Sequence, residues 1–154
     1  MIENENIIKA DPTKEFFIDM LTLDIASTKA INDLIDNCVD GANRIRSEKN
    51  YEGLEVRIEA GPKQFRIIDN CGGISVKIAR DYAFRFGRPS DIDPISKSIG
   101  LFGVGMKRAL FKLGSKFIVN SRTETSRFVV EVDVDEWKIM MIGNFNSRIL
   151  MNRC

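Results

Sequence analysis

The chain has 154 residues, of which 44% are hydrophobic and 29% charged, enough to bury one substantial core in a single domain. Its 23 basic and 22 acidic residues give a net charge of +1, so the charge balance provides no clear footprint for nucleic acid or a membrane surface. Because the chain has no histidine, zinc sites that use His, Ser-His-Asp and Cys-His catalysis, and a phosphoaccepting histidine are all excluded.

The N-terminal part is predicted to lead into one long amphipathic helix. Residues 1–15 are largely polar and are expected to be loose, and the apolar residues 16–23 could form either a short strand or a helix. A helix is predicted over residues 27–46, with Ser27 or Thr28 as its N-cap, because apolar side chains recur there at helical spacing. The apolar stripe consists of Ile31, Leu34, Ile35, Cys38 and Ala42.

The other face of this helix carries polar side chains that could do chemistry. Asp33, Asn37 and Asp40 fall together there, and a carboxylate four residues before a carboxamide lies on the adjacent turn. An Asn oxygen is a neutral hard ligand for magnesium, and a nearby carboxylate can accept a proton from water. Taken alone, the pattern is more often a solvated helix face, and Asp36 and Asp40 are expected to make surface or capping contacts.

Two strands are predicted after this helix. Residues 54–60 alternate between apolar and polar side chains, and a turn at residues 61–63 leads into a second strand over residues 64–69. This strand stops at Asp69 and turns through Gly72 and Gly73. An Asp followed by two glycines is usually just a turn, so this motif carries little weight by itself.

A third helix and an irregular segment come next. Apolar residues at helical spacing predict a helix over residues 75–86. Residues 87–98 contain glycine, prolines and polar residues without periodicity, which is typical of a mobile lid.

A glycine-rich segment then precedes another helical run. Glycines before a helix leave exposed backbone N–H groups and room for a phosphate at the positive end of the helix dipole. Met106 separates the last glycine from the lysine, which excludes a Walker loop, and Arg108 stands where a dinucleotide fingerprint would need glycine. On its own, the cluster could be a packed turn. The candidate phosphate-binding residues are Gly100, Gly103, Gly105 and Lys107.

The C-terminal part is predicted to begin with a hairpin and to end irregularly. Residues 116–121 and 127–134 alternate as two strands around a polar turn. Residues 138–154 contain no acidic residue and no clear alternation, so we expect an irregular tail on a truncated domain. A sheet without its final strand would expose an unpaired edge, which favours self-association or binding of a partner protein.

Three short motifs occur in this chain in a fixed order. The first is Asp-x-x-x-Asn on a helix, the second is Asp with glycines at a strand end, and the third is Gly-x-x-Gly-x-Gly-x-Lys before a helix. In this order they resemble the GHKL ATPases, which include DNA gyrase B subunits, heat-shock chaperones, histidine kinases and MutL-type proteins. The resemblance covers residues 16–137, and residues 17–26 look like a bacterial branch usually described as ATP-binding proteins. It implies an α+β fold, a two-layer Bergerat-type sandwich with a mixed sheet and helices on one face.

The resemblance assigns a role to each candidate residue. Asn37 matches the asparagine that holds magnesium, and Asp69 matches the aspartate that accepts a hydrogen bond from the adenine amino group. Gly73 matches the glycine that lets the backbone approach the purine. Asp33 stands in place of the glutamate that activates water. The phosphate-binding positions are matched by Gly100, Gly103, Gly105 and Lys107.

The sequence departs from the family pattern at two positions. Asp33 is one methylene shorter than glutamate, so it is a slow base or the helix lies closer to the nucleotide; a displacement of about 1 Å can cost on the order of a hundredfold in rate. Cys71 stands where the family often has glycine, and Gly72 could make the turn instead. The register of this loop is therefore open.

These features predict an ATP-binding module that acts as a slow magnesium-dependent ATPase and conformational switch. The alternatives are a non-hydrolysing nucleotide-binding domain and a protein-interaction domain. Cys38, Cys71 and Cys154 lack the spacing of a metal site and are expected to be reduced thiols. No apolar run reaches the roughly 18 residues of a membrane span and no signal peptide is present, so a cytoplasmic location without membrane contact is expected.

Overall fold

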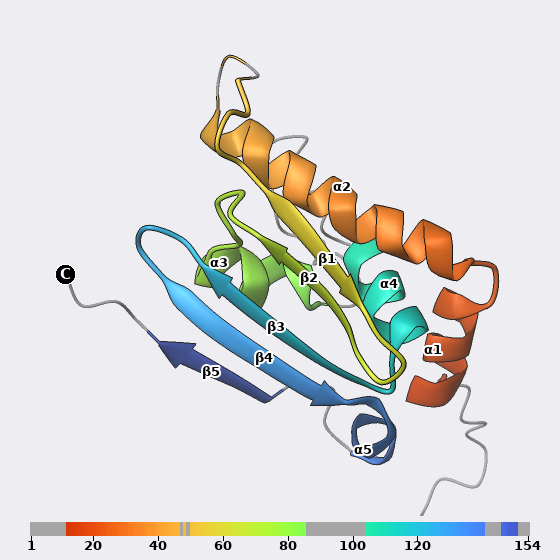
Figure 1. The fold of residues 1–154 in the computed structure, drawn as a ribbon. Coiled ribbons are helices and arrows are strands. Elements are labelled where there is room, and N and C mark those ends of the chain that lie inside the picture. The colour runs from red at the N-terminus through yellow and green to blue at the C-terminus, as the bar shows by residue number, and fades with distance from the viewer. Residues whose placement is uncertain (1–11, 47, 49, 86–103, 141–145, 151–154) are drawn as a thin grey trace, which may run out of the picture.

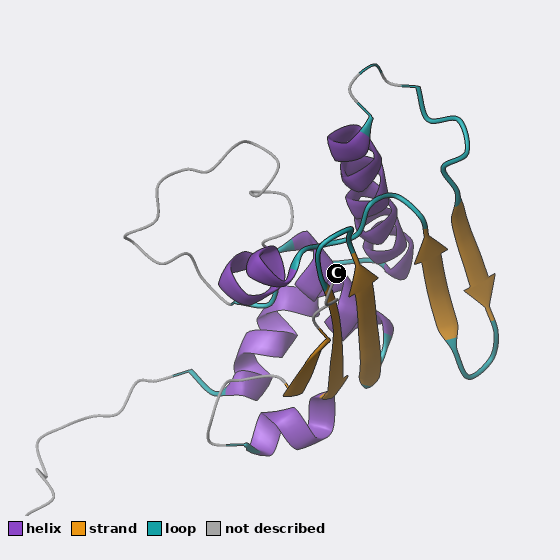
Figure 2. Cartoon of the chain, turned by 90° about the vertical axis from the view of Figure 1, so that its left-hand side faces the viewer, coloured by secondary structure: helices purple, strands orange, loops and turns teal. Residues whose placement is uncertain are grey.

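A computed structural model of the chain describes residues 12–46, 48, 50–85, 104–140 and 146–150. Its helices are α1 (Lys14–Thr22), α2 (Ser27–Ile45), α3 (Val76–Ile78), the π-helix η1 (Ala79–Ala83), α4 (Gly105–Leu113) and α5 (Val134–Ile139). Its strands are β1 (Val56–Ala60), β2 (Phe65–Asp69), β3 (Lys116–Arg122), β4 (Arg127–Asp133) and β5 (Asn146–Leu150). Most of the helices lie on one side of the strands (Figures 1 and 2).

The strands form two antiparallel sheets. β1 pairs with β2 from Val56↔Asp69 to Ala60↔Phe65, and the second sheet has the order β3-β4-β5. Within the described residues, the predicted single mixed sheet is therefore wrong, whereas the α+β class is consistent with the structure. A side chain ties the loop after β2 to the second sheet: the hydroxyl of Ser121 on β3 accepts a hydrogen bond from the Ile74 amide at 2.7 Å and donates to the Ile74 carbonyl at 3.1 Å.

The main core lies between the inner face of β4 and the helices. Burial alternates along β4, so that Phe128, Val130 and Val132 point inward at 2 to 4% exposure. Trp137 of α5 and Phe111 of α4 join the same cluster, with their ring centroids 5.7 Å apart. The strict alternation fixes the register of β4, because a slip of one residue would turn the whole apolar set toward water.

A second cluster sets the relative position of α2 and α4. Ala30 of α2 and Ala109 of α4 are both 0% exposed and pack together with Ile25. Two alanines at the contact let the helix axes approach closely, and Leu34 and Leu113 pack around them. The beginning of α4 is thereby held beside the middle of α2, where Asp33 lies.

Several predicted elements are confirmed, with local differences. The helix predicted over residues 27–46 is α2, but its N-cap is Ala26, whose methyl group cannot accept the capping hydrogen bond expected of Ser27 or Thr28. The apolar segment 16–23 is helical as part of α1. The helix predicted over residues 75–86 is the short α3 followed by the π-helix η1. The predicted hairpin is formed by β3 and β4.

Residues 138–154, predicted to form an irregular tail, include the strand β5. β5 pairs antiparallel with β4, from Arg127↔Leu150 to Glu131↔Asn146. The edge of β4 offers backbone N–H and C=O groups that need partners, and β5 satisfies them although its sequence does not alternate. β5 thus covers the edge of β4, and β3 and β5 are the outer strands of this sheet. Self-association stays a prediction.

The predicted lid over residues 87–98 and the glycines Gly100 and Gly103 lie outside the described residues. Across the described parts of the chain, no helix is both long and apolar enough to cross a membrane. The domain boundaries at residues 15 and 137 stay predictions.

Candidate functional site

The polar face of α2 and the first residue of α4 meet at Asp33. A Cβ placed on Gly105 would lie 3.9 Å from both Cβ and Cγ of Asp33, and 4.0 Å from its Oδ2. The other oxygen of Asp33, Oδ1, forms an ion pair with Lys29, one turn earlier on the same helix. The Asp33 side chain is only 14% exposed, against 63% for Lys29. Asp33 is therefore a mostly covered carboxylate with one oxygen held by an ammonium and the other beside Gly105.

Asn37 lies one turn after Asp33 and is oriented by the helix itself. Its side-chain Nδ2 donates a hydrogen bond to the Asp33 carbonyl at 2.8 Å. This bond uses the donor of the carboxamide and leaves its oxygen as the atom suited to a hard cation. The described residues hold no cluster of three His, Cys, Asp or Glu side chains able to bind a metal.

The beginning of α4 offers backbone donors. Gly105 is the first residue of this helix, and among the described contacts its N-cap, Val104, makes no side-chain capping hydrogen bond. The first turn also carries no acidic side chain. The amide groups of this turn and the positive end of the helix dipole are therefore suited to an anion.

Lys107, which was predicted to lie near a terminal phosphate, has its ammonium hydrogen-bonded to the backbone. The side chain is 5% exposed, and its Nζ donates to the carbonyl of Arg85, just beyond η1. Burial lowers the pKa of Lys107 to about 8. The predicted role of Lys107 near a terminal phosphate stays a prediction.

Asp69 ends β2 and begins a compact loop. Its Oδ1 accepts a hydrogen bond from the Cys71 amide at 2.9 Å, which fixes the carboxylate relative to the loop backbone. Burial, together with the nearby Asp69 carboxylate, raises the pKa of Cys38 on α2 to about 12, so this thiol remains neutral. Gly72 and Gly73 have φ angles of +95° and +65°, and the buried Cys71 does not take part in this left-handed turn. The two glycines thus make the turn, and Cys71 packs inside.

Two glycines allow this loop to be wedged between α2 and β3. A Cβ on Gly41 of α2 would lie 2.4 Å from the Cys71 carbonyl oxygen, and one on Gly73 would lie 2.3 Å from the Arg122 carbonyl oxygen. Both distances are far below van der Waals contact with backbone atoms that cannot move aside. Glycine at position 73 is therefore required by packing, in addition to the purine contact that the sequence predicts for it.

Sequence reasoning missed two cations at this site. Lys29 could have been recognised as a partner of Asp33, since the two are four residues apart on one helix. Arg44, in the last turn of α2, donates from Nη2 to the Gly73 carbonyl at 3.0 Å. No local pattern predicts this second contact, because it depends on how the loop packs against the helix.

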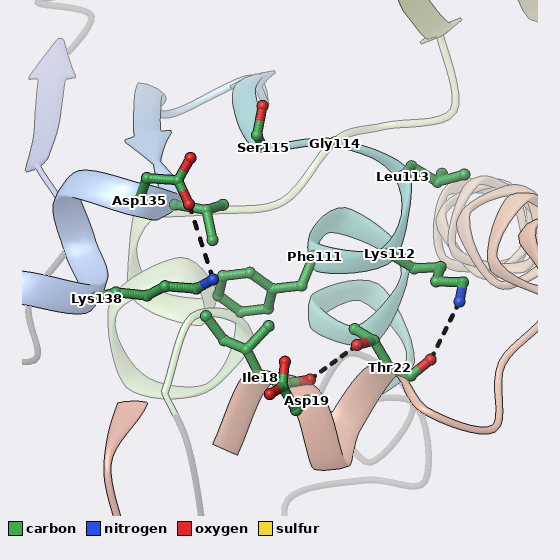
Figure 3. A pocket seen from close by; sticks show the side chains of 11 residues that line it. Ile18, Asp19, Thr22, Phe111, Lys112, Leu113, Gly114, Ser115, Asp135 and Lys138 are labelled. Atoms are coloured by element: carbon green, nitrogen blue, oxygen red, sulfur yellow. Dashed lines mark hydrogen bonds and ion pairs between the residues drawn. The ribbon is translucent and has the colours of Figure 1, made fainter. Parts of the chain in front are cut away.

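A cavity of about 370 Å³ lies away from these residues, at the C-terminal end of α4. Figure 3 shows its walls, which come from α1, α4 and α5. Two lysines are held at its margin: Lys112 donates to the Thr22 carbonyl at 3.3 Å, and Lys138 pairs with Asp135 at 3.8 Å. None of the predicted site residues lines this cavity.

Comparison with known families gives a match that covers most of the chain. The family model described as histidine kinase-, DNA gyrase B-, and HSP90-like ATPase matches residues 25–144. The matched region includes every candidate site residue. Comparison with curated proteins gives no match.

We predict that Gly41→Ala destabilises the fold. Alanine favours a helix by about 1 kcal/mol over glycine, but the new Cβ would lie 2.4 Å from the Cys71 carbonyl oxygen, and such overpacking costs about 1–3 kcal/mol or more. Urea unfolding should therefore show a net loss of stability. Gly61→Ala is the matched control, because its Cβ would lie 3.6 Å from the nearest atom, the Gln64 carbonyl oxygen. A Gly41→Ala variant as stable as the parent would contradict the tight contact.

Proposed function

The chain belongs to the histidine kinase-, DNA gyrase B- and HSP90-like ATPases, and we propose that it binds ATP between α2, the loop after β2 and the beginning of α4. The observation that carries this proposal is the proximity of Gly105 to Asp33, where a Cβ built on the glycine would lie 3.9 Å from the Asp33 side chain; this contact unites two motifs that are distant in the sequence. The proposal includes a Bergerat-type two-layer arrangement and the bacterial branch of ATP-binding proteins that the sequence resembles.

The phosphates would bind at the junction of α2 and α4. The amide groups of the first α4 turn would donate to phosphate oxygens, and the Asn37 oxygen would be one ligand for a magnesium ion, which would offset the phosphate charge. Lys29 offsets the negative charge of Asp33, which would otherwise repel a polyphosphate. Gly100, Gly103 and Lys107 complete this end of the site in the proposal.

The purine would bind at the loop after β2. The Asp69 carboxylate is a pure acceptor, as recognition of the adenine amino group requires, and the Cys71 amide holds one of its oxygens in place. In this proposal a carboxylate oxygen of Asp69 would accept the hydrogen bond from the adenine amino group. The left-handed backbone at Gly73 presents a surface without a side chain, against which a purine can lie closely.

Hydrolysis would use Asp33 as the base that activates water. Oδ2 is the oxygen beside Gly105, whereas Oδ1 is engaged by Lys29. The short side chain and this ion pair both favour slow turnover, which suits a conformational switch better than a metabolic ATPase. The same two features support a second candidate function, a nucleotide-binding domain that does not hydrolyse ATP.

We predict that two substitutions affect binding in different ways. Asp69→Asn places a donor opposite the adenine amino group and should weaken ATP binding by roughly tenfold to a hundredfold, the range for a hydrogen bond to a charged group. Asn37→Ala should instead remove the magnesium dependence of binding. Titration calorimetry with and without magnesium measures both.

The matched controls are Asp36→Asn and Asn32→Ala, at exposed positions of the same helix. If the site substitutions behave like these controls, the assignment of the site is wrong.

We also predict that Asp33→Asn lowers phosphate release while ATP affinity survives. A general base contributes about 10²–10⁴-fold to the rate and is needed for turnover, not for affinity. Asp33→Glu should raise the rate by extending the carboxylate toward the reach of the family's glutamate. Equal turnover in Asp33→Asn and the parent would remove Asp33 from the mechanism, and a loss in Asp36→Asn would then identify Asp36 as the base.

A further inference from the structure

Arg44 lies where α2 meets the loop that follows β2. From the last turn of the helix, its Nη2 donates to the Gly73 carbonyl at 3.0 Å. The carboxylates of Asp40 and Asp69 both lie close enough to interact with its positive charge. The guanidinium therefore touches one residue of the proposed purine site and faces another.

This contact is one of three between α2 and the loop, in which Gly41, Ile45 and Arg44 of the helix contact Cys71, Gly72 and Gly73, respectively. At one end, Gly41 approaches the Cys71 carbonyl so closely that a Cβ would lie 2.4 Å from it. At the next residue of the loop, a Cβ on Gly72 would lie 2.6 Å from Cγ2 of Ile45. The contact of Arg44 with Gly73 is a directional hydrogen bond, whereas the other two contacts are steric.

The charges around Arg44 are arranged to keep it in place. The residue as a whole stays exposed, but packing of the guanidinium against the loop removes water from it and lowers its pKa, an effect that Asp40 and Asp69 oppose. Burial likewise raises the pKa of Asp40, and Arg44 opposes that shift. An arginine suits a carbonyl and two carboxylates better than a lysine does, because its planar guanidinium can donate to the carbonyl while its delocalised charge faces the carboxylates.

We propose that Arg44 is a positioning residue of the nucleotide site, which clamps the Gly73 carbonyl onto α2 and so holds the loop and Asp69 at a fixed place relative to Asn37. This inference rests on the proposed ATP-binding function. The loop has left-handed backbone at Gly72 and Gly73, a conformation open to glycine at little cost but not enforced by it. The hydrogen bond from Arg44 fixes the loop conformation. Because α2 also carries Asp33 and Asn37, the same bond sets the position of the loop relative to the proposed phosphate end.

The test is a set of double-mutant cycles with ATP affinity measured by calorimetry. Arg44→Ala alone should weaken ATP binding roughly tenfold, as expected for loss of a charge-assisted hydrogen bond that orders the loop. In the Asp69→Asn background the same change should cost roughly twofold or less, because Arg44 acts through the residue already altered. In the Asn37→Ala background it should keep its full effect, because the phosphate end is separate.

Conservative variants and a neighbouring arginine provide the controls. Arg44→Lys, which keeps the charge but loses the planar fork, should recover only part of the affinity, and Arg44→Gln, which keeps a donor but loses the charge, should recover less. Arg46→Ala removes an exposed arginine just beyond the end of the same helix and should leave affinity unchanged. If Arg44→Ala fails to fold, the comparison of the Lys and Gln variants provides the same test.

Full additivity of Arg44→Ala with Asp69→Asn, or an affinity equal to that of Arg46→Ala, would overturn the role of Arg44 while leaving ATP binding intact. Failure of the unsubstituted chain to bind ATP is a different result, since it contradicts the proposed function itself and the inference with it.

Discussion

The contact between Gly41 of α2 and the Cys71 carbonyl is the constraint on which the geometry of the site depends. At this point the helix that carries Asp33 and Asn37 meets the loop that carries Asp69, with no side chain between them. The distance between the proposed phosphate and purine ends is therefore set by backbone packing, which is stiffer than any pair of side chains. The alanine contact between α2 and α4 fixes the third component, the beginning of α4, against the same helix. One helix thus serves as the common frame for residues from three parts of the chain.

The charged groups of the candidate site are arranged along α2. Three carboxylates, Asp33, Asp40 and Asp69, lie on or beside one helix, and each has a cation within reach from the same helix. Lys29 pairs with Asp33, and Arg44 lies near both Asp40 and Asp69. Without these partners, the site would repel a polyphosphate that itself carries several negative charges. The two cations reduce the formal charge of these three carboxylates from −3 to −1.

Much of the fold and the family could be predicted from the sequence, because the relevant signals are local, whereas the roles of the candidate site residues stay predictions. Helical spacing of apolar residues predicted α2 to within one residue at its end, and strand alternation predicted the β3–β4 hairpin. The order of three short motifs led to the ATPase family that the family model identifies. The features that sequence reasoning missed depend on contacts between residues that are distant in the sequence. β5 lacks alternation and forms because the edge of β4 needs a partner, and the Arg44–Gly73 bond arises only once the loop is packed on α2.

A titration of the uniformly ¹⁵N-labelled chain with magnesium and a non-hydrolysable ATP analogue, followed by amide NMR shifts, tests the site most directly. Amides of Cys71, Gly73 and Gly105 should shift together at one affinity, because one ligand would span the loop and the beginning of α4. Amides at the other end of α4, at Leu113, Gly114 and Ser115, line the separate cavity and should stay unchanged. Shifts confined to that second group would place the nucleotide in the cavity and contradict the site proposed for it.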